Sequence, residues 1–228
     1  MSKNDAINLI LQSKERILNH LMQIIVNNNF NYKTFGTEIE DYLEGILIEI
    51  LTEGDFINSE NDYHRAKDKN EFPDFILKTT PNLALEFKSG NQNKKSNGKW
   101  VICTNSNNDM GTLNMWEKKL EQFGGDNIYY IFIIYNFNDN VKEISDIQIA
   151  PFYKFIGINR DGMLKYREKD GNLRPKDFTK LSPIQDLRQF KNLLDKTVIY
   201  RSKRIIEKHI KNIPEEERNN FLNSLKTF

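Results

Sequence analysis

The sequence is poor in cysteine: Cys103 is the only one, so no disulfide can form within the chain. A lone thiol is typical of a reducing compartment, and we expect a cytoplasmic protein. Long apolar runs are also missing, since none reaches the roughly 18 residues that a membrane-spanning helix needs. The N-terminus lacks the apolar core and cleavage site of a signal peptide. These absences predict a soluble protein with no membrane segment.

An excess of charge of one sign is equally absent. The chain has 33 basic and 32 acidic residues, a net charge of +1. The overall charge therefore indicates no partner, and only a local basic region would attract a polyanion. The 3 histidines and the cysteine show no zinc-ligand spacing, and neither a P-loop nor a GxGxxG motif is present.

The 228 residues suit a single domain (1–228) with a substantial core. Apolar residues at helical spacing predict helices over 5–27, 37–53, 112–123 and 184–211, with a short last helix beyond Pro214. Short apolar runs bounded by Pro, Gly and Asn predict strands within 72–90, 100–104, 127–137 and 144–158, and one short strand within the polar stretch 54–71. Residues 89–99 are expected to form a loop and 159–182 an irregular segment. Helices before and after a mixed central sheet indicate an α/β or α+β fold.

The stretch FPDFILKTTPNLALEFKSG (72–90) predicts two short strands joined by a polar connection. Side chains alternate along a strand, so Glu86 and Lys88 point to the same face. Pro73 suits the start of a strand and places Asp74 at its first residues. If the two strands pair as a hairpin, Asp74 approaches Glu86 and Lys88, and we expect all three charges to be exposed at strand ends.

Two carboxylates this close repel each other unless a cation lies between them. Mg²⁺ suits such a pair because it prefers oxygen ligands and often bridges carboxylates to phosphate. An adjacent lysine can hold a phosphate oxygen or help activate water. These groups suit the hydrolysis of a phosphodiester. The alternative interpretation is a surface hairpin with a cross-strand ion pair, Asp74 or Glu86 with Lys88.

The predicted helix 37–53 is rich in acidic residues, among which Glu40 and Glu44 lie one turn apart beside the apolar stripe. Most of its carboxylates suit a solvated face. Glu40 is placed to meet the hairpin if this helix packs on the sheet. His64, ten residues before Asp74, is either a neighbour of the site or a polar surface residue.

The combination of Pro73-Asp74 with Glu86-Phe87-Lys88 resembles the PD-(D/E)xK nuclease superfamily, and most closely its type II restriction endonucleases. The upstream string GTEIEDYLEGIL resembles the G-x-x-(L/I)-E-(E/D)-Y stretch of some small restriction enzymes, with Glu40 at the glutamate. The direct resemblance spans about residues 36–90. It implies a restriction-endonuclease-like fold, a catalytic core over 36–158, Mg²⁺, double-stranded DNA, a homodimer and a short palindromic site.

A basic stretch near the C-terminus is a second feature that favours DNA as the ligand. Between Arg188 and Lys211 lie eight basic and two acidic residues, a local net charge of +6. Apolar residues are expected to hold one face of this helix inward, which would leave the basic face for phosphates. The candidate phosphate contacts are Arg201, Lys203, Arg204 and Lys208. The helical region 183–228 is thus a candidate for DNA binding or dimerisation.

Two polar stretches follow the proposed site and are candidates for contacts in a groove or along the backbone: Lys94, Lys95 and Lys99, and then Asn105 and Asn107. Asparagine can read adenine bidentately, and lysine can read guanine. Which of these residues reads a base stays open.

Taken together, the sequence predicts a Mg²⁺-dependent endonuclease of restriction type. Asp74 and Glu86 would hold the metal, and Lys88 would orient or deprotonate the attacking water and neutralise charge on the phosphate. Glu40 would complete this site or a second metal site. Two alternatives stay open. One is a DNA-binding or assembly protein without catalysis, and the other is a repair or recombination nuclease of the same fold.

Overall fold

The structure is a computed structural model that describes residues 2–31, 33–68, 71–94, 100–102, 108–137, 142–175 and 180–224. Four residues singled out above, Lys95, Lys99, Asn105 and Asn107, lie outside the described residues.

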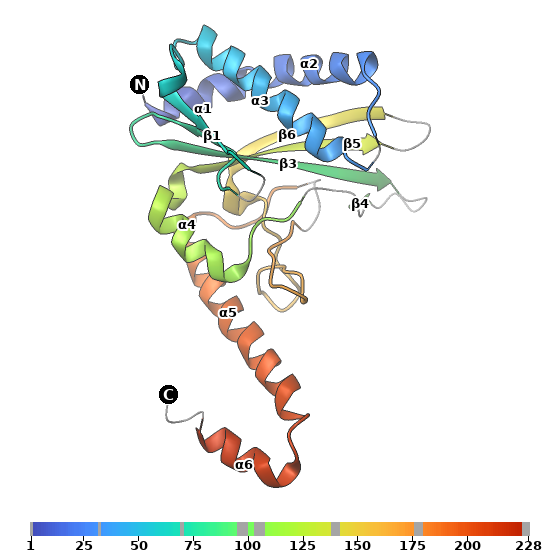
Figure 1. The fold of residues 1–228 in the computed structure, drawn as a ribbon, viewed down its shortest axis with the longest axis vertical. Helices are drawn as coiled ribbons and strands as arrows, with labels where there is room; N and C mark the ends of the chain where they lie inside the picture. Colours follow the sequence, from blue (N-terminus) through green and yellow to red (C-terminus); the bar gives the residue numbers. More distant parts are fainter. Residues whose placement is uncertain are drawn as a thin grey trace.

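A mixed β-sheet forms the centre of the molecule (Figure 1), as the sequence predicts. Its strands lie in the order β1 (Tyr63–Arg65), β2 (Phe75–Leu77), β3 (Leu83–Lys94), β5 (Ile128–Phe137) and β6 (Lys142–Pro151). Strands β3 and β5 are parallel, and the other neighbours are antiparallel. Strand β4 (Trp100–Ile102) pairs with the last residues of β3. β5 is an interior strand between β3 and β6 and is almost wholly buried, which agrees with its apolar residues on both faces.

Three N-terminal helices cover one face of the sheet (Figure 1): α1 (Lys3–Gln12), α2 (Lys14–Asn27) and α3 (Phe35–Glu53). The prediction of one helix over 5–27 is wrong, because the chain turns at Ser13, which ends α1 and begins α2. The turn lets α1 and α2 each pack on α3. Leu83, Leu85 and Phe87 point from β3 into this layer.

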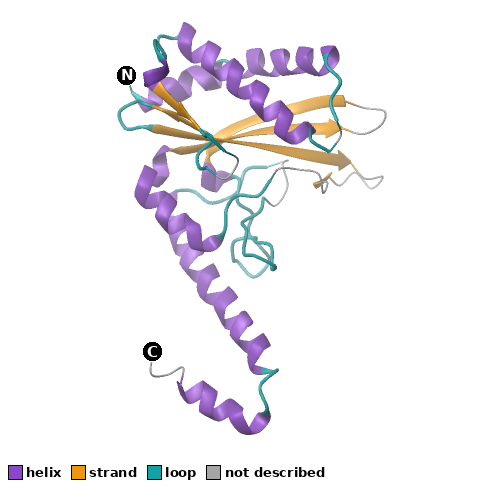
Figure 2. Cartoon of the chain, in the orientation of Figure 1, coloured by secondary structure: helices purple, strands orange, loops and turns teal. Residues whose placement is uncertain are grey.

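The opposite face is covered by α4 (Trp116–Phe123), by the first half of α5 (Leu187–Ile210) and by irregular chain (Figure 2). Trp116 is fully buried here, stacked on Phe152 at 4.2 Å between ring centroids. Short 3-10 turns complete the chain: η1 (Glu60–Asp62), η2 (Leu113–Met115), η3 (Gly125–Asn127) and η4 (Phe152–Lys154). Ala84, Glu86 and Lys88 alternate with the residues of the first layer and therefore belong to this second face.

Strand β3 is longer than expected. Residues 89–99 were expected to form a loop, but β3 continues to Lys94. Its polar residues Ser89 and Asn91 are buried because they lie beside β5, with which the pairing continues to Asn91 opposite Tyr135. The Asn91 side-chain amide donates to the carbonyl of Phe137 at 3.2 Å, which satisfies it inside the sheet.

The second half of α5 and the last helix, α6 (Glu215–Ser224), project away from the sheet (Figure 1). Phe190 and Leu194 of α5 are buried, but Ile205 and Ile206 are 38% and 41% exposed. The expectation that apolar residues hold one face of this helix inward is therefore wrong for these two isoleucines, because the helix has left the body of the protein at that point. None of the described helices has the length and apolarity to cross a membrane.

Candidate active site

The β2–β3 hairpin brings Asp74 and Glu86 together. The antiparallel register pairs Phe75 with Leu85, so Asp74, the residue just before β2, falls opposite Glu86. The backbone N–H of Asp74 donates to Glu86 Oε2 at 3.2 Å, and the N–H of Phe87 donates to Asp74 Oδ2 at 2.6 Å. The Glu86 carboxylate is thus oriented by the backbone of Asp74, and the Asp74 carboxylate by the backbone of Phe87, the residue after Glu86.

Lys88 joins this pair from two residues along β3. Its Nζ lies 2.8 Å from Glu86 Oε1, and it also donates to the carbonyl of Phe87 at 2.9 Å. The side chains of Glu86 and Lys88 are each only 10% exposed. The expectation of exposed charges at strand ends is wrong, because both residues lie inside the long strand β3 and beneath the second layer.

The electrostatics of the hairpin reflect this burial. Burial and the neighbouring Glu86 raise the pKa of Asp74 to about 7. Burial opposes the charge of Lys88, but Glu86, Asp74 and Glu40 outweigh it and raise the Lys88 pKa above its usual range. Lys88 therefore keeps its positive charge at neutral pH, and the carboxylates around it favour a further cation.

The donor set suits Mg²⁺ better than a metal that needs a full protein cage. Two carboxylates converge, while no group of three or more acidic, histidine or cysteine side chains in the described ranges is placed to hold an ion. Mg²⁺ is commonly held by one or two carboxylates together with water and phosphate oxygens. Asp74 and Glu86 are the two residues placed for this, and Glu40 does not complete a group of three with them.

Glu40 reaches the same region from α3. It is 9% exposed and close enough to Lys88 to raise the lysine pKa. A close contact one turn earlier positions it: a Cβ on Gly36 would lie only 2.6 Å from Ser89 Oγ of β3. Glycine thus lets the first turn of α3 approach the strand. Glu44, on the next turn, instead pairs with Arg65 of β1.

Lys119 on α4 is near the site, although the sequence pattern did not single it out. Its ammonium lies 3.4 Å from the ring centroid of Phe72, and its pKa responds to Glu86, Lys88 and Asp74. The adjacent Lys118 is exposed. Only the tertiary position of α4 distinguishes the two lysines, so no sequence signal would have found Lys119.

Other predicted residues lie apart from the hairpin. His64 Nε2 lies 2.8 Å from Glu71 Oε1, so its described partner is not a residue of the site. On α5, Arg204 pairs with Glu168 at 2.6 Å, and Arg201 donates to the carbonyl of the same residue at 3.3 Å. Lys203 and Lys208 are exposed. Lys94 is the last residue of β3.

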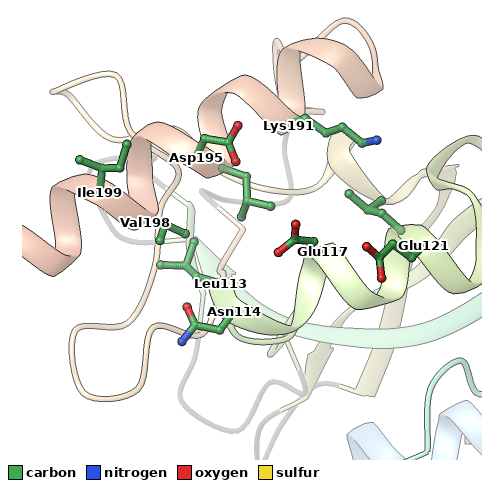
Figure 3. A pocket seen from close by; sticks show the side chains of 10 residues that line it. Leu113, Asn114, Glu117, Glu121, Lys191, Asp195, Val198 and Ile199 are labelled. Atoms are coloured by element: carbon green, nitrogen blue, oxygen red, sulfur yellow. The ribbon is translucent and has the colours of Figure 1, made fainter. Parts of the chain in front are cut away.

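A hollow of about 750 Å³ lies between η2–α4 and α5 (Figure 3). Figure 3 shows Glu117 and Glu121 on one side and Lys191 and Asp195 on the other. Its lining includes none of the hairpin charges, so it is separate from the candidate active site.

The mixed sheet and its helical layers form an α/β fold that is restriction-endonuclease-like. Among solved structures, the chain is similar to NlaIV restriction endonuclease, with 19% identity and a TM-score of 0.53. The match covers 76% of this chain and 67% of that chain. No protein-family model matches the sequence, and no curated protein matches it. The similarity therefore establishes the fold, and the hairpin geometry must support the function.

Proposed function

We propose that this protein is a Mg²⁺-dependent endonuclease of restriction type, which hydrolyses phosphodiester bonds of double-stranded DNA at a short, palindromic site. One observation carries the proposal: Asp74, Glu86 and Lys88 converge in a fold shared with a restriction endonuclease. Enclosed charges of this kind are typical of active sites, because burial and mutual interaction shift their pKa values.

The residues have distinct roles in this proposal. Asp74 and Glu86 would hold the ion, which when bound supplies positive charge to polarise the phosphate. Lys88, held by Glu86 and kept charged by its neighbours, would orient the attacking water and stabilise negative charge developing on the phosphate. Glu40 would act through Lys88, whose charge it supports. Its direct role as a metal ligand has no support in the geometry.

DNA would be held by residues outside the hairpin. Arg201, Lys203, Arg204 and Lys208 of α5 are proposed to contact phosphates, which adds affinity independently of sequence. Lys94 ends β3, and Lys95, Lys99, Asn105 and Asn107 follow it in sequence. These residues are proposed to contact a groove or the DNA backbone. A palindromic site would be matched by a homodimer, since both have twofold symmetry.

The burial of the cluster favours catalysis over the alternative of a DNA-binding or assembly protein with an exposed ion-pair cluster. Exposed ion pairs stabilise proteins by little, whereas burying a lysine between carboxylates carries a desolvation cost. Such an arrangement is unlike ordinary surface charge. It is typical of a site that functions through its electrostatics.

Incubation of supercoiled plasmid DNA with Mg²⁺ tests the proposal. Discrete fragments are expected, and EDTA should abolish them. A smear would indicate a repair or recombination nuclease that acts on ends or DNA structure. An intact plasmid over a range of sequences and metal ions would overturn the assignment as a nuclease.

A further inference from the structure

Lys119 lies on the same side of the sheet as Glu86 and Lys88, and aromatic rings hold it in place. Its ammonium lies 3.4 Å from the ring centroid of Phe72 and 5.1 Å from that of Trp116. Trp116 is fully buried, and Phe72 packs edge-on against both Trp116 and Phe123. Cation–π contacts with anchored rings orient the lysine without neutralising it.

The Lys119 ammonium has no acceptor among the residues that the structure describes. Within the described parts of the chain, Lys119 makes no hydrogen bond and no ion pair, although it is partly buried. Burial lowers its pKa to about 8, with Glu86 and Asp74 supporting the charge and Lys88 opposing it. An ammonium removed from water without an acceptor is unfavourable. An acceptor from outside the protein would satisfy it.

The two lysines near the carboxylates differ in how many of their donors are used. Lys88 already contacts Glu86 Oε1 and the carbonyl of Phe87. With the described residues Lys119 has only ring contacts, at a position where the carboxylates Glu86 and Asp74 affect its charge. Lys88 is therefore committed to the hairpin, whereas Lys119 is available to a ligand.

We propose that Lys119 is a second cation of the site and that it binds a phosphate oxygen of the DNA beside the hairpin. This inference rests on the proposed function for the identity of the ligand. The two lysines then have different roles. Lys88 balances the charge of the carboxylates and supports the reacting centre, and Lys119 binds the phosphate. A lysine serves such a contact as a compact point charge with three donors.

The test compares Lys119→Met with Lys118→Met, which removes the same charge from the exposed neighbour on the same helix. Methionine preserves the length and the apolar contact with Phe72, so the fold should be kept, and a melting curve checks this. Binding of a duplex DNA fragment is measured against salt concentration with Ca²⁺ in place of Mg²⁺. The salt slope should fall by about 0.9 in Lys119→Met, as for one lost phosphate contact on duplex DNA.

Single-turnover cleavage of plasmid DNA in Mg²⁺ provides a second readout. Loss of Lys119 should slow cleavage about 100-fold, the scale of losing one charge-stabilising donor. Lys118→Met should cut at the wild-type rate, and Lys119→Arg should recover part of the lost rate because it restores the charge.

The salt slope of DNA binding is by itself a sufficient test of the contact between Lys119 and a phosphate. A slope unchanged in Lys119→Met would overturn the phosphate contact, whatever the cleavage rate. If the wild-type protein cuts no DNA, the proposed function fails, but a reduced slope would still support Lys119 as a phosphate contact. The two failures are thus distinguishable.

Discussion

Two regions of this molecule concentrate charge, and they do so in opposite ways. In the β2–β3 hairpin, Glu86 and Lys88 are each 10% exposed and paired at 2.8 Å. On the distal half of α5, Arg204 and its partner Glu168 are 51% and 63% exposed. Screening by water makes each surface charge individually weak, whereas buried charges are strongly coupled. Single substitutions in the hairpin should therefore have large effects on cleavage. Substitutions on α5 should change DNA binding only in proportion to the charge removed.

The largest effect is expected in the hairpin. Asp74→Ala, Glu86→Ala or Lys88→Ala should each reduce cleavage by at least about 100-fold, because each removes a group from the proposed reacting centre. Single-turnover cleavage of plasmid DNA measures this loss. Lys78→Ala, which alters an exposed lysine just beyond β2, should leave the rate unchanged. Near wild-type cleavage by Lys88→Ala would refute the assigned active site.

A second prediction separates the activity of the hairpin from its stability. The pKa of Asp74 is about 7 in the folded protein because of burial and Glu86, against a usual value of 3.8. Between these values the folded state binds more protons than the unfolded state, so stability falls as pH rises through the window and is lowest above it. Asp74→Asn removes this penalty and should melt higher than wild type at pH 8 in EDTA.

The difference in melting temperature should shrink toward pH 4, where Asp74 is neutral in the wild-type protein. The same variant should not cut DNA. A lower melting temperature for Asp74→Asn at pH 8 would show that the Asp74 carboxylate is not destabilising. Thermal unfolding of both proteins across pH 4 to 8 checks the prediction.

Two glycines of α3 provide a matched pair of substitutions. A Cβ on Gly45 meets nothing within 4 Å, so Gly45→Ala should stabilise the helix by about 1 kcal/mol. A Cβ on Gly36 would lie 2.6 Å from Ser89 Oγ, and such overpacking costs about 1–3 kcal/mol. In denaturant unfolding, the free energy of unfolding should be higher than wild type for Gly45→Ala and lower for Gly36→Ala.

Gly36→Ala should also slow cleavage, because a shift of the first turn of α3 moves Glu40 away from Lys88. Equal cleavage by Gly36→Ala and Gly45→Ala would argue that the approach of α3 to β3 has no functional role.

The smallest effect is expected on α5. The double variant Arg201→Gln/Arg204→Gln should lower the salt slope of duplex binding by about 0.9 for each phosphate contact that is lost. Because the Arg204–Glu168 pair is exposed, the melting temperature should change little. If both slope and affinity are unchanged, the phosphate contacts lie elsewhere and this part of α5 faces solvent or a second copy.

The sequence was informative where local rules decide the structure. Alternation in residues 83–88 and the position of Pro73 predicted the hairpin and the approach of its charged residues. The apolar run 128–137 predicted a strand covered on both faces. The rest depended on contacts between distant segments. Ser89 and Asn91 look like loop residues until β5 pairs with them, and Lys119 is indistinguishable from Lys118 until α4 packs against the sheet.

The same limit applies to α5. Leu194 and Ile205 both follow a helical pattern in the sequence, but only Leu194 has a layer to pack against. Whether an amphipathic stripe is buried is a property of the whole fold, so the pattern could predict the helix but not where it leaves the body.

The departure of α5 from the body has a consequence for amide hydrogen exchange. Amides near Phe190 and Leu194 are protected by buried side chains, so they should exchange only through large unfolding events. Amides from Ile205 onward belong to a helix with exposed side chains, and short unsupported helices are only marginally stable in water. Protection should therefore decline along this single helix. A ligand that binds the distal half of α5 should slow amide exchange there, even if exchange in the sheet does not change.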